Sequence, residues 1–188
     1  MLASRSPRRR ELLARLGLEF EVCPATGEEK APGREEPPAY ALRLARAKAK
    51  EVFEKNAGKA VLAADTIVVC EGEILGKPKD ASDAYRMLKL LSGRVHQVFT
   101  AYVILKDGET RERVVETKVF FKVLEEEEIA AYLATGEPWD KAGAYAIQGI
   151  ASYMVERVEG SVTNVIGLPL TEVVADLLAL QIVTWRVP

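Results

Sequence analysis

Three consecutive cations, Arg8–Arg10, stand where the sequence predicts the start of a helix. Ser6 suits the N-cap position and Pro7 suits the first helical position, so the helix should begin here. The positive end of a helix disfavours arginine. A bound anion would reverse that cost, because free backbone N–H groups, serine hydroxyls such as Ser4 and guanidinium groups all bind phosphate. The alternative is a solvated helix start that tolerates its charge.

One carboxylate, Asp65, interrupts the apolar run Val61–Cys70, which reads as a strand. A carboxylate in such a place must be paired, bound to a metal or placed at a sheet end that faces a cleft. Positions of this kind favour perturbed acidity and function. The alternative for Asp65 is a strand-ending aspartate that caps a turn. The alternative for Thr66, its neighbour, is a simple strand former.

Two loop residues could contact a nucleotide. Lys77 lies in the loop Gly76-Lys77-Pro78 and could reach a phosphate, although exposed loop lysines are common. Gln148 lies between Ile147 and Gly149, where we expect a buried setting. Its amide offers a donor and an acceptor, which suit the acceptor–donor–acceptor edge of thymine or uracil. The alternative is a glutamine that satisfies neighbouring backbone groups.

His96 is the single histidine of the chain, so any histidine base would have to be this residue. We interpret it as a structural strand residue that ties the sheet to a loop. Carboxylates and a metal are therefore the expected catalytic tools. Cys23 and Cys70 lack the spacing of a zinc site, and we expect two buried thiols in a reduced compartment.

The elements that must position these residues alternate along the chain. The predicted helices cover 6–17, 38–56, 80–91, 125–136 and 170–180. The predicted strands cover 20–22, 61–70, 95–106, 111–124, 144–148, 153–157 and 182–187. A long hairpin turns at Asp107-Gly108, a strong hairpin signal. This order predicts one α/β domain over residues 1–188, with a mixed twisted sheet, flanking helices and two lobes around a central cleft.

Length and charge exclude several classes of protein. The 188 residues suffice for one core or two small lobes. The net charge of −2 gives no global field that would attract nucleic acid. No stretch reaches the roughly 20 apolar residues of a membrane span, and the first residues lack the apolar core of a signal peptide. We therefore expect a cytoplasmic protein without nucleic-acid or membrane partners.

The order of the motifs is more specific than any one of them. The motif-bearing segments are Leu2–Arg9, Ala64-Asp65-Thr66, Gly76-Lys77-Pro78, Val95–Thr100, Asp140–Tyr145 and Gly167-Leu168-Pro169. Together they resemble the Maf family over essentially the whole chain. The resemblance implies a nucleotide pyrophosphatase, often a homodimer, with a two-lobed fold related to the inosine triphosphatase class. Asp140–Tyr145 with the following Ile-Gln-Gly is similar to the dTTP/UTP branch rather than the 7-methyl-GTP branch.

The resemblance also implies roles for single residues. Asp65 would be the catalytic proton acceptor, or instead chiefly a metal ligand, and Glu29 would be a further ligand of Mg²⁺ or Mn²⁺. The implied substrate-binding residues are Ser4, Arg8, Arg9, Lys48, Thr66, Lys77 and Gln148. The chain departs from the family at Thr26-Gly27-Glu28-Glu29, where an Asp-x-Asp-Glu run is usual. The acidic ligand could therefore be Glu29 or Glu28.

The expected activity is hydrolysis of dTTP and UTP, and of modified pyrimidine triphosphates, to the monophosphate and pyrophosphate. The alternative is a nucleotide-binding regulator of cell division and septum formation without turnover. Pyrophosphate release separates the two, because a regulator would bind nucleotide without releasing pyrophosphate.

Overall fold

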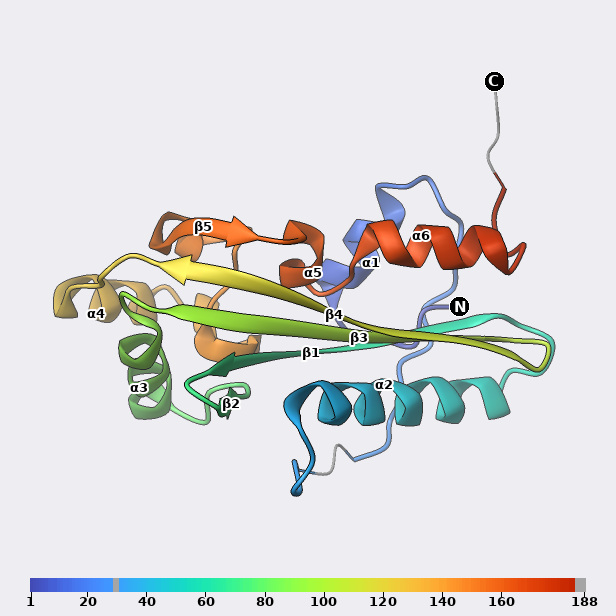
Figure 1. The fold of residues 1–188 in the computed structure, drawn as a ribbon, viewed down its shortest axis with the longest axis horizontal. Coiled ribbons are helices and arrows are strands. Elements are labelled where there is room, and N and C mark those ends of the chain that lie inside the picture. Colours follow the sequence, from blue (N-terminus) through green and yellow to red (C-terminus); the bar gives the residue numbers. More distant parts are fainter. Residues whose placement is uncertain (29–30, 185–188) are drawn as a thin grey trace. The chain divides into compact units, whose positions relative to one another are not determined.

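The computed structural model describes residues 1–28 and 31–184 (Figure 1). Its α-helices are α1 (Pro7–Ala14), α2 (Pro37–Glu54), α3 (Ala81–Leu91), α4 (Glu126–Ala134), α5 (Val162–Ile166) and α6 (Leu170–Ala179). Its strands are β1 (Val61–Cys70), β2 (Glu73–Leu75), β3 (Val95–Lys106), β4 (Glu109–Phe121) and β5 (Val155–Glu159). Three 3₁₀-helices complete it: η1 (Glu137–Asp140), η2 (Ala142–Ala144) and η3 (Ile150–Met154). No helix in the described part of the chain is long and apolar enough to cross a membrane.

The strands form one sheet in the order β2-β1-β3-β4-β5. The pairs β1–β2 and β4–β5 are antiparallel, and two residues join β3 to β4 in the predicted hairpin. Leu2 adds isolated parallel bridges to Val22 and to Leu62. The predicted α/β class with a mixed sheet is therefore confirmed.

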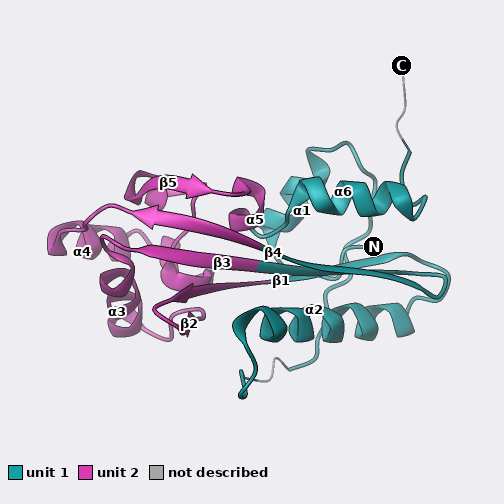
Figure 2. Cartoon of the chain, viewed as in Figure 1, with its two compact units in different colours: residues 1–65, 100–115, 167–188 teal, residues 66–99, 116–166 magenta. Residues whose placement is uncertain are grey.

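The chain divides into two compact units (Figure 2). Unit 1 comprises Met1–Asp65, Thr100–Val115 and Gly167–Pro188, and unit 2 comprises Thr66–Phe99 and Glu116–Ile166. Each of β1, β3 and β4 begins in one unit and ends in the other. This division agrees with the two lobes that the sequence predicts.

Unit 1 has helices on both sides of its strands. In Figure 2 α2 runs along one side, and α1 and α6 run along the other. The buried face of α2 consists of small and branched apolar side chains, Ala41, Leu44, Ala45, Ala49 and Val52. Three of these residues are alanines, and Lys48 of the same helix reaches Asp65 of β1.

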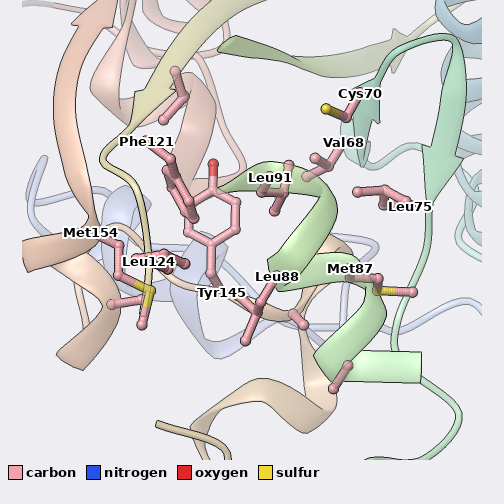
Figure 3. Packing of buried hydrophobic residues seen from close by; sticks show 14 of the residues in the cluster. Val68, Cys70, Leu75, Met87, Leu88, Leu91, Phe121, Leu124, Tyr145 and Met154 are labelled. Atoms are coloured by element: carbon pink, nitrogen blue, oxygen red, sulfur yellow. The ribbon is translucent and has the colours of Figure 1, made fainter. Parts of the chain in front are cut away.

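Unit 2 has its own apolar core, in which α3 packs against the ends of the strands (Figure 3). Tyr145 lies beside Phe121 within this core, with ring centroids 4.8 Å apart and the rings nearly perpendicular. Such edge-to-face contacts add to the free energy gained from burying the rings. They anchor the segment that carries Tyr145.

Three predicted strands differ from the structure. The strand 144–148 is wrong: Gly143 and Ala144 have φ angles of 68° and 61°, and this left-handed backbone ends extended structure. Near Val22 only a single bridge forms. Residues 182–184 of the predicted closing strand are not in a strand, and 185–187 lie outside the described residues. The short helix α5 was not predicted.

Candidate functional site

The start of α1 has the predicted cap. Ser6 adopts an extended conformation, and its hydroxyl accepts a hydrogen bond from the Arg9 backbone N–H at 3.4 Å. The first turn contains no acidic residue, so nothing in it offsets the positive end of the helix. The helix start therefore combines the helix dipole with arginine side chains, which is the combination that favours an anion.

Arg9 is fixed rather than solvated, since only 9% of the residue is exposed. Its Nε donates to the Gly167 carbonyl at 2.7 Å, and its Nη1 donates to the Ser4 hydroxyl at 3.3 Å. Ser4 is also buried. The structure thus brings Ser4 and Arg9 together, whereas Arg8 is half-buried and Arg10 is exposed. The solvated alternative for the whole arginine run is wrong for Arg9.

Asp65 is the fifth residue of β1 and is 7% exposed. Its Oδ1 accepts from Lys48 Nζ of α2 at 2.5 Å, and both side chains are largely buried. The strand continues to Cys70, so the alternative of a strand-ending cap is excluded. The contact with Lys48 orients this buried carboxylate, and an oriented carboxylate suits a proton acceptor or a metal ligand.

The parallel bridge of Leu2 relates Asp65 to the start of α1. The Ala3 N–H donates to the Leu62 carbonyl at 2.8 Å, and the Leu62 N–H donates to the Met1 carbonyl at 2.9 Å. Because the pairing is parallel, both segments leave the bridge in the same direction. Ser4 lies two residues beyond Leu2, and Asp65 lies three residues beyond Leu62. The start of α1 and Asp65 are therefore at the same end of this pairing within unit 1.

The other candidate substrate residues lie in unit 2. Thr66 is half-buried in β1, and Lys77 is exposed in its loop. Gln148 is exposed as well, so the predicted buried setting is wrong. It lies in a turn of an irregular segment that follows the left-handed residues at 143 and 144.

The Lys77 loop and the segment before Gln148 are joined through backbone. The Gly143 N–H donates to the Gly76 carbonyl at 3.1 Å. A Cβ at Gly143 would lie 3.1 Å from the Val68 side chain, so only glycine allows this approach without a shift. The two loops that carry Lys77 and Gln148 are thus held together within unit 2.

Glu51 was not predicted from the sequence, and it anchors the loop Thr26–Glu28 of unit 1. Its carboxylate accepts from the backbone N–H groups of Thr26 and Gly27 at 3.0 and 2.9 Å. Hydrogen bonds from Lys55 and then from Thr26 hold the pKa of Glu51 far below its usual range. Glu28 follows this anchor and is exposed, whereas Glu29 lies outside the described residues. Helical periodicity gave no signal, because Glu51 is one of several charged residues along α2.

No three acidic, histidine or cysteine side chains of residues 1–28 and 31–184 form a group that could hold a metal. The Asp65 carboxylate is nevertheless a ligand of the type that Mg²⁺ takes in proteins. Mg²⁺ is commonly bound by one or two carboxylates together with phosphate oxygens. The donor chemistry is compatible with a divalent cation shared between Asp65 and a nucleotide.

His96 is a structural residue, as predicted. Its Nε2 lies 2.8 Å from the Tyr145 hydroxyl, and the residue is 1% exposed. Burial lowers the pKa of His96 to about 3, so the ring is neutral near pH 7. The cysteine prediction is half right: both thiols are free, but Cys70 is buried and Cys23 is only partly buried.

Comparison with known proteins gives one consistent result. The family model described as Maf-like protein matches residues 1–180. A protein of Geobacter sulfurreducens named dTTP/UTP pyrophosphatase is 58% identical over 181 residues, 94% of each chain. Proteins with the same name from Geotalea uraniireducens and Thermococcus gammatolerans are 55% and 50% identical. These alignments cover 94% and 90% of this chain, and 92% and 90% of the relatives.

Proposed function

Since the chain belongs to the family of Maf-like proteins, we propose that it hydrolyses dTTP and UTP to the nucleoside monophosphate and pyrophosphate. The structural observation that carries this proposal is Asp65, a buried carboxylate that Lys48 holds inside an apolar strand. A carboxylate that is costly to bury indicates chemistry rather than packing. Modified pyrimidine triphosphates belong to the same substrate class.

In the proposed reaction the triphosphate binds at the start of α1. Its oxygens accept hydrogen bonds from the side chains of Arg8, Arg9 and Ser4. Lys77, in the loop of unit 2, is a further candidate for phosphate binding. Asp65 accepts a proton from a water molecule that attacks the α-phosphorus. The bond from this phosphorus to the bridging oxygen breaks, so that pyrophosphate leaves with the bonding electron pair. Lys48 orients the Asp65 carboxylate.

A divalent cation, Mg²⁺ or Mn²⁺, held by Asp65, Glu29 and the phosphates would neutralise the charge that develops in this step. Positioning by Arg9 and Lys48 supplies much of the remaining rate enhancement, because both side chains are already ordered. Gln148, Thr66 and Arg8 select the base in this proposal. An exposed amide suits that role, since a ligand can reach it.

The assembly and location of the protein are part of the same proposal. We propose a homodimer in the cytoplasm, without nucleic-acid or membrane partners. The free thiols of Cys23 and Cys70 are compatible with a reduced compartment.

The test is the release of pyrophosphate from dTTP, UTP, CTP and GTP with Mg²⁺ or Mn²⁺. We expect wild-type protein to prefer dTTP and UTP, and Asp65→Asn to lower turnover by about a hundredfold or more, as loss of a general base does. Circular dichroism checks that the variant is folded.

Glu112→Gln is the matched control, because Glu112 is a carboxylate of unit 1 in an exposed pair with Arg46. It should turn over like wild type. Near-normal turnover by folded Asp65→Asn would refute the role of Asp65. Orthophosphate as the first product would exclude attack at the α-phosphorus, and saturable binding without pyrophosphate would favour a regulator of cell division.

A further inference from the structure

Glu137 accepts three hydrogen bonds within unit 2. Its Oε2 accepts from the Ile150 backbone N–H at 2.8 Å. Its Oε1 accepts from the Ala151 backbone N–H at 3.2 Å and from the Tyr132 hydroxyl at 3.1 Å. Bonds of this kind to a carboxylate are about twice as strong as bonds between neutral groups. Glu137 therefore fixes the backbone at Ile150 and Ala151.

The fixed backbone lies directly beside Gln148. The Gly149 N–H donates to the Ala146 carbonyl at 3.0 Å, which closes a turn with Gln148 inside it. The Ser152 N–H donates to the Gly149 carbonyl at 3.1 Å, so the turn leads straight into η3. Gln148 is thus exposed on a turn whose C-terminal side is held by Glu137.

Gly149 shows how closely the carboxylate approaches this turn. A Cβ at Gly149 would lie 2.4 Å from Glu137 Oε2 and 2.5 Å from Glu137 Oε1. The backbone at Gly149 is extended, with φ −106° and ψ −156°, so a side chain is opposed here by the carboxylate and not by the backbone. A longer residue at 149 would have to displace Glu137 from its three donors.

We propose that Glu137 is a positioning residue for base recognition, because its carboxylate fixes the turn that presents Gln148 to the pyrimidine. The proposal rests on the function proposed above, in which Gln148 reads the base. An exposed glutamine on a mobile turn would lose conformational freedom on binding, and a fixed turn lowers that cost. The side chain of Glu137 does not need to touch the nucleotide.

The test compares UTP with CTP, whose bases differ in the hydrogen-bonding edge that Gln148 would read. In Glu137→Ala we expect KM for UTP to rise about tenfold and the ratio of kcat/KM for UTP over CTP to fall by a similar factor. We expect kcat for UTP to change less than KM, because the groups at Asp65 are untouched.

Two further variants address the same contact. Glu137→Gln keeps one oxygen for Tyr132 and Ala151 but turns an NH₂ toward the Ile150 N–H, so its effect should be smaller than that of Glu137→Ala. Gly149→Ala should change the UTP-to-CTP ratio in the same direction as Glu137→Ala. Added to Glu137→Ala, it should have little further effect, since its opposing carboxylate is gone.

Glu128→Ala is the matched control, because the Glu128 carboxylate also accepts a backbone N–H. Within the described residues its hydrogen bonds come from Lys122 and Glu125 and not from the Gln148 turn. It should lower the melting temperature and leave the UTP-to-CTP ratio unchanged. A wild-type ratio in folded Glu137→Gln and Gly149→Ala would overturn the proposal, even if Glu137→Ala does not fold. Absence of UTP hydrolysis by wild type would instead refute the function on which the proposal rests.

Discussion

At the scale of single residues, buried polar side chains such as His96 form hydrogen bonds that hold the fold together. His96 lies in a ring cluster with Phe121 and Tyr145, and its Nε2 meets the Tyr145 hydroxyl. Burial is the cause of its lowered pKa. A neutral imidazole in this place holds the segment 142–149 against β3, and that same segment carries Gln148. His96 therefore acts on the candidate site only through the fold of unit 2.

The buried histidine makes stability depend on pH. The pKa of His96 is about 3 in the folded protein and near 6.5 in the unfolded chain, so below pH 6.5 the unfolded chain binds a proton that the folded protein does not. Stability from this residue is complete above pH 6.5 and decreases as the pH falls toward 3. Between pH 7 and pH 5 we expect a loss of about 2 kcal/mol in the free energy of unfolding.

Urea unfolding of wild type and His96→Gln at pH 7 and pH 5 measures this loss. The glutamine amide can still meet the Tyr145 hydroxyl but does not titrate, so the variant should be less stable at pH 7 and should lose less between the two pH values. His96 is the single histidine, which leaves few other groups that titrate in this range. Equal losses in the two proteins would show that His96 takes up a proton at pH 5 in the folded protein as readily as in the unfolded chain, which contradicts its lowered pKa.

At the scale of elements, α6 is attached to the β3–β4 hairpin by one buried carboxylate within unit 1. Asp176 of α6 accepts from the Tyr102 hydroxyl of β3 at 2.6 Å and from two nitrogens of Arg113 of β4 at 2.6 and 2.8 Å. Hydrogen bonding from Arg113 lowers the pKa of Asp176, so the carboxylate is ionised near pH 7. The three elements are far apart in sequence, and no local pattern indicates this contact.

Removal of the carboxylate should destabilise the protein strongly. In Asp176→Ala the Tyr102 hydroxyl, which is fully buried, loses its acceptor, and we expect a loss of about 2–3 kcal/mol in the free energy of unfolding. Glu112→Ala breaks the exposed Arg46 pair instead and should cost less than about 1 kcal/mol. Urea titrations give both values. Similar costs for the two variants would mean that burial of the Asp176 contact adds no stability.

At the scale of the whole molecule, the two units share their strands. The chain passes between them four times, and three of these passages, at Asp65, Phe99 and Val115, fall within a strand. Neither unit is continuous in sequence. We interpret the chain as one domain for this reason, and a single unfolding transition is the corresponding expectation.

This interpretation can be tested with one tryptophan. Trp139 belongs to unit 2, and the background substitution Trp185→Phe leaves it as the single tryptophan. Asp176→Ala, a change in unit 1, should lower the midpoint of the Trp139 fluorescence transition as much as that of far-ultraviolet circular dichroism. If the fluorescence midpoint stays at its original position while the dichroism signal shifts, the two units unfold separately and the one-domain interpretation is wrong.

Features that depend on neighbouring residues could be predicted from the sequence. The cap at Ser6, strand β1 and the hairpin turn at Asp107 follow from local chemistry: side-chain capping, apolar runs and turn preferences. The family also follows from the sequence, because the order of the motifs is specific. Asp65 could be recognised as unusual for the same local reason, since a carboxylate in an apolar run is visible without a structure.

Contacts between groups that are distant in sequence became visible only in the folded chain. The pairing of Lys48 with Asp65, the buried place of Arg9 beside Gly167 and the hold of Glu137 on the backbone after Gln148 each join separate segments. The exposure of Gln148 was mispredicted because the prediction rested on its neighbours Ile147 and Gly149, whereas the backbone forms a turn at Gln148. Periodicity describes one segment at a time, whereas these contacts depend on how the segments pack.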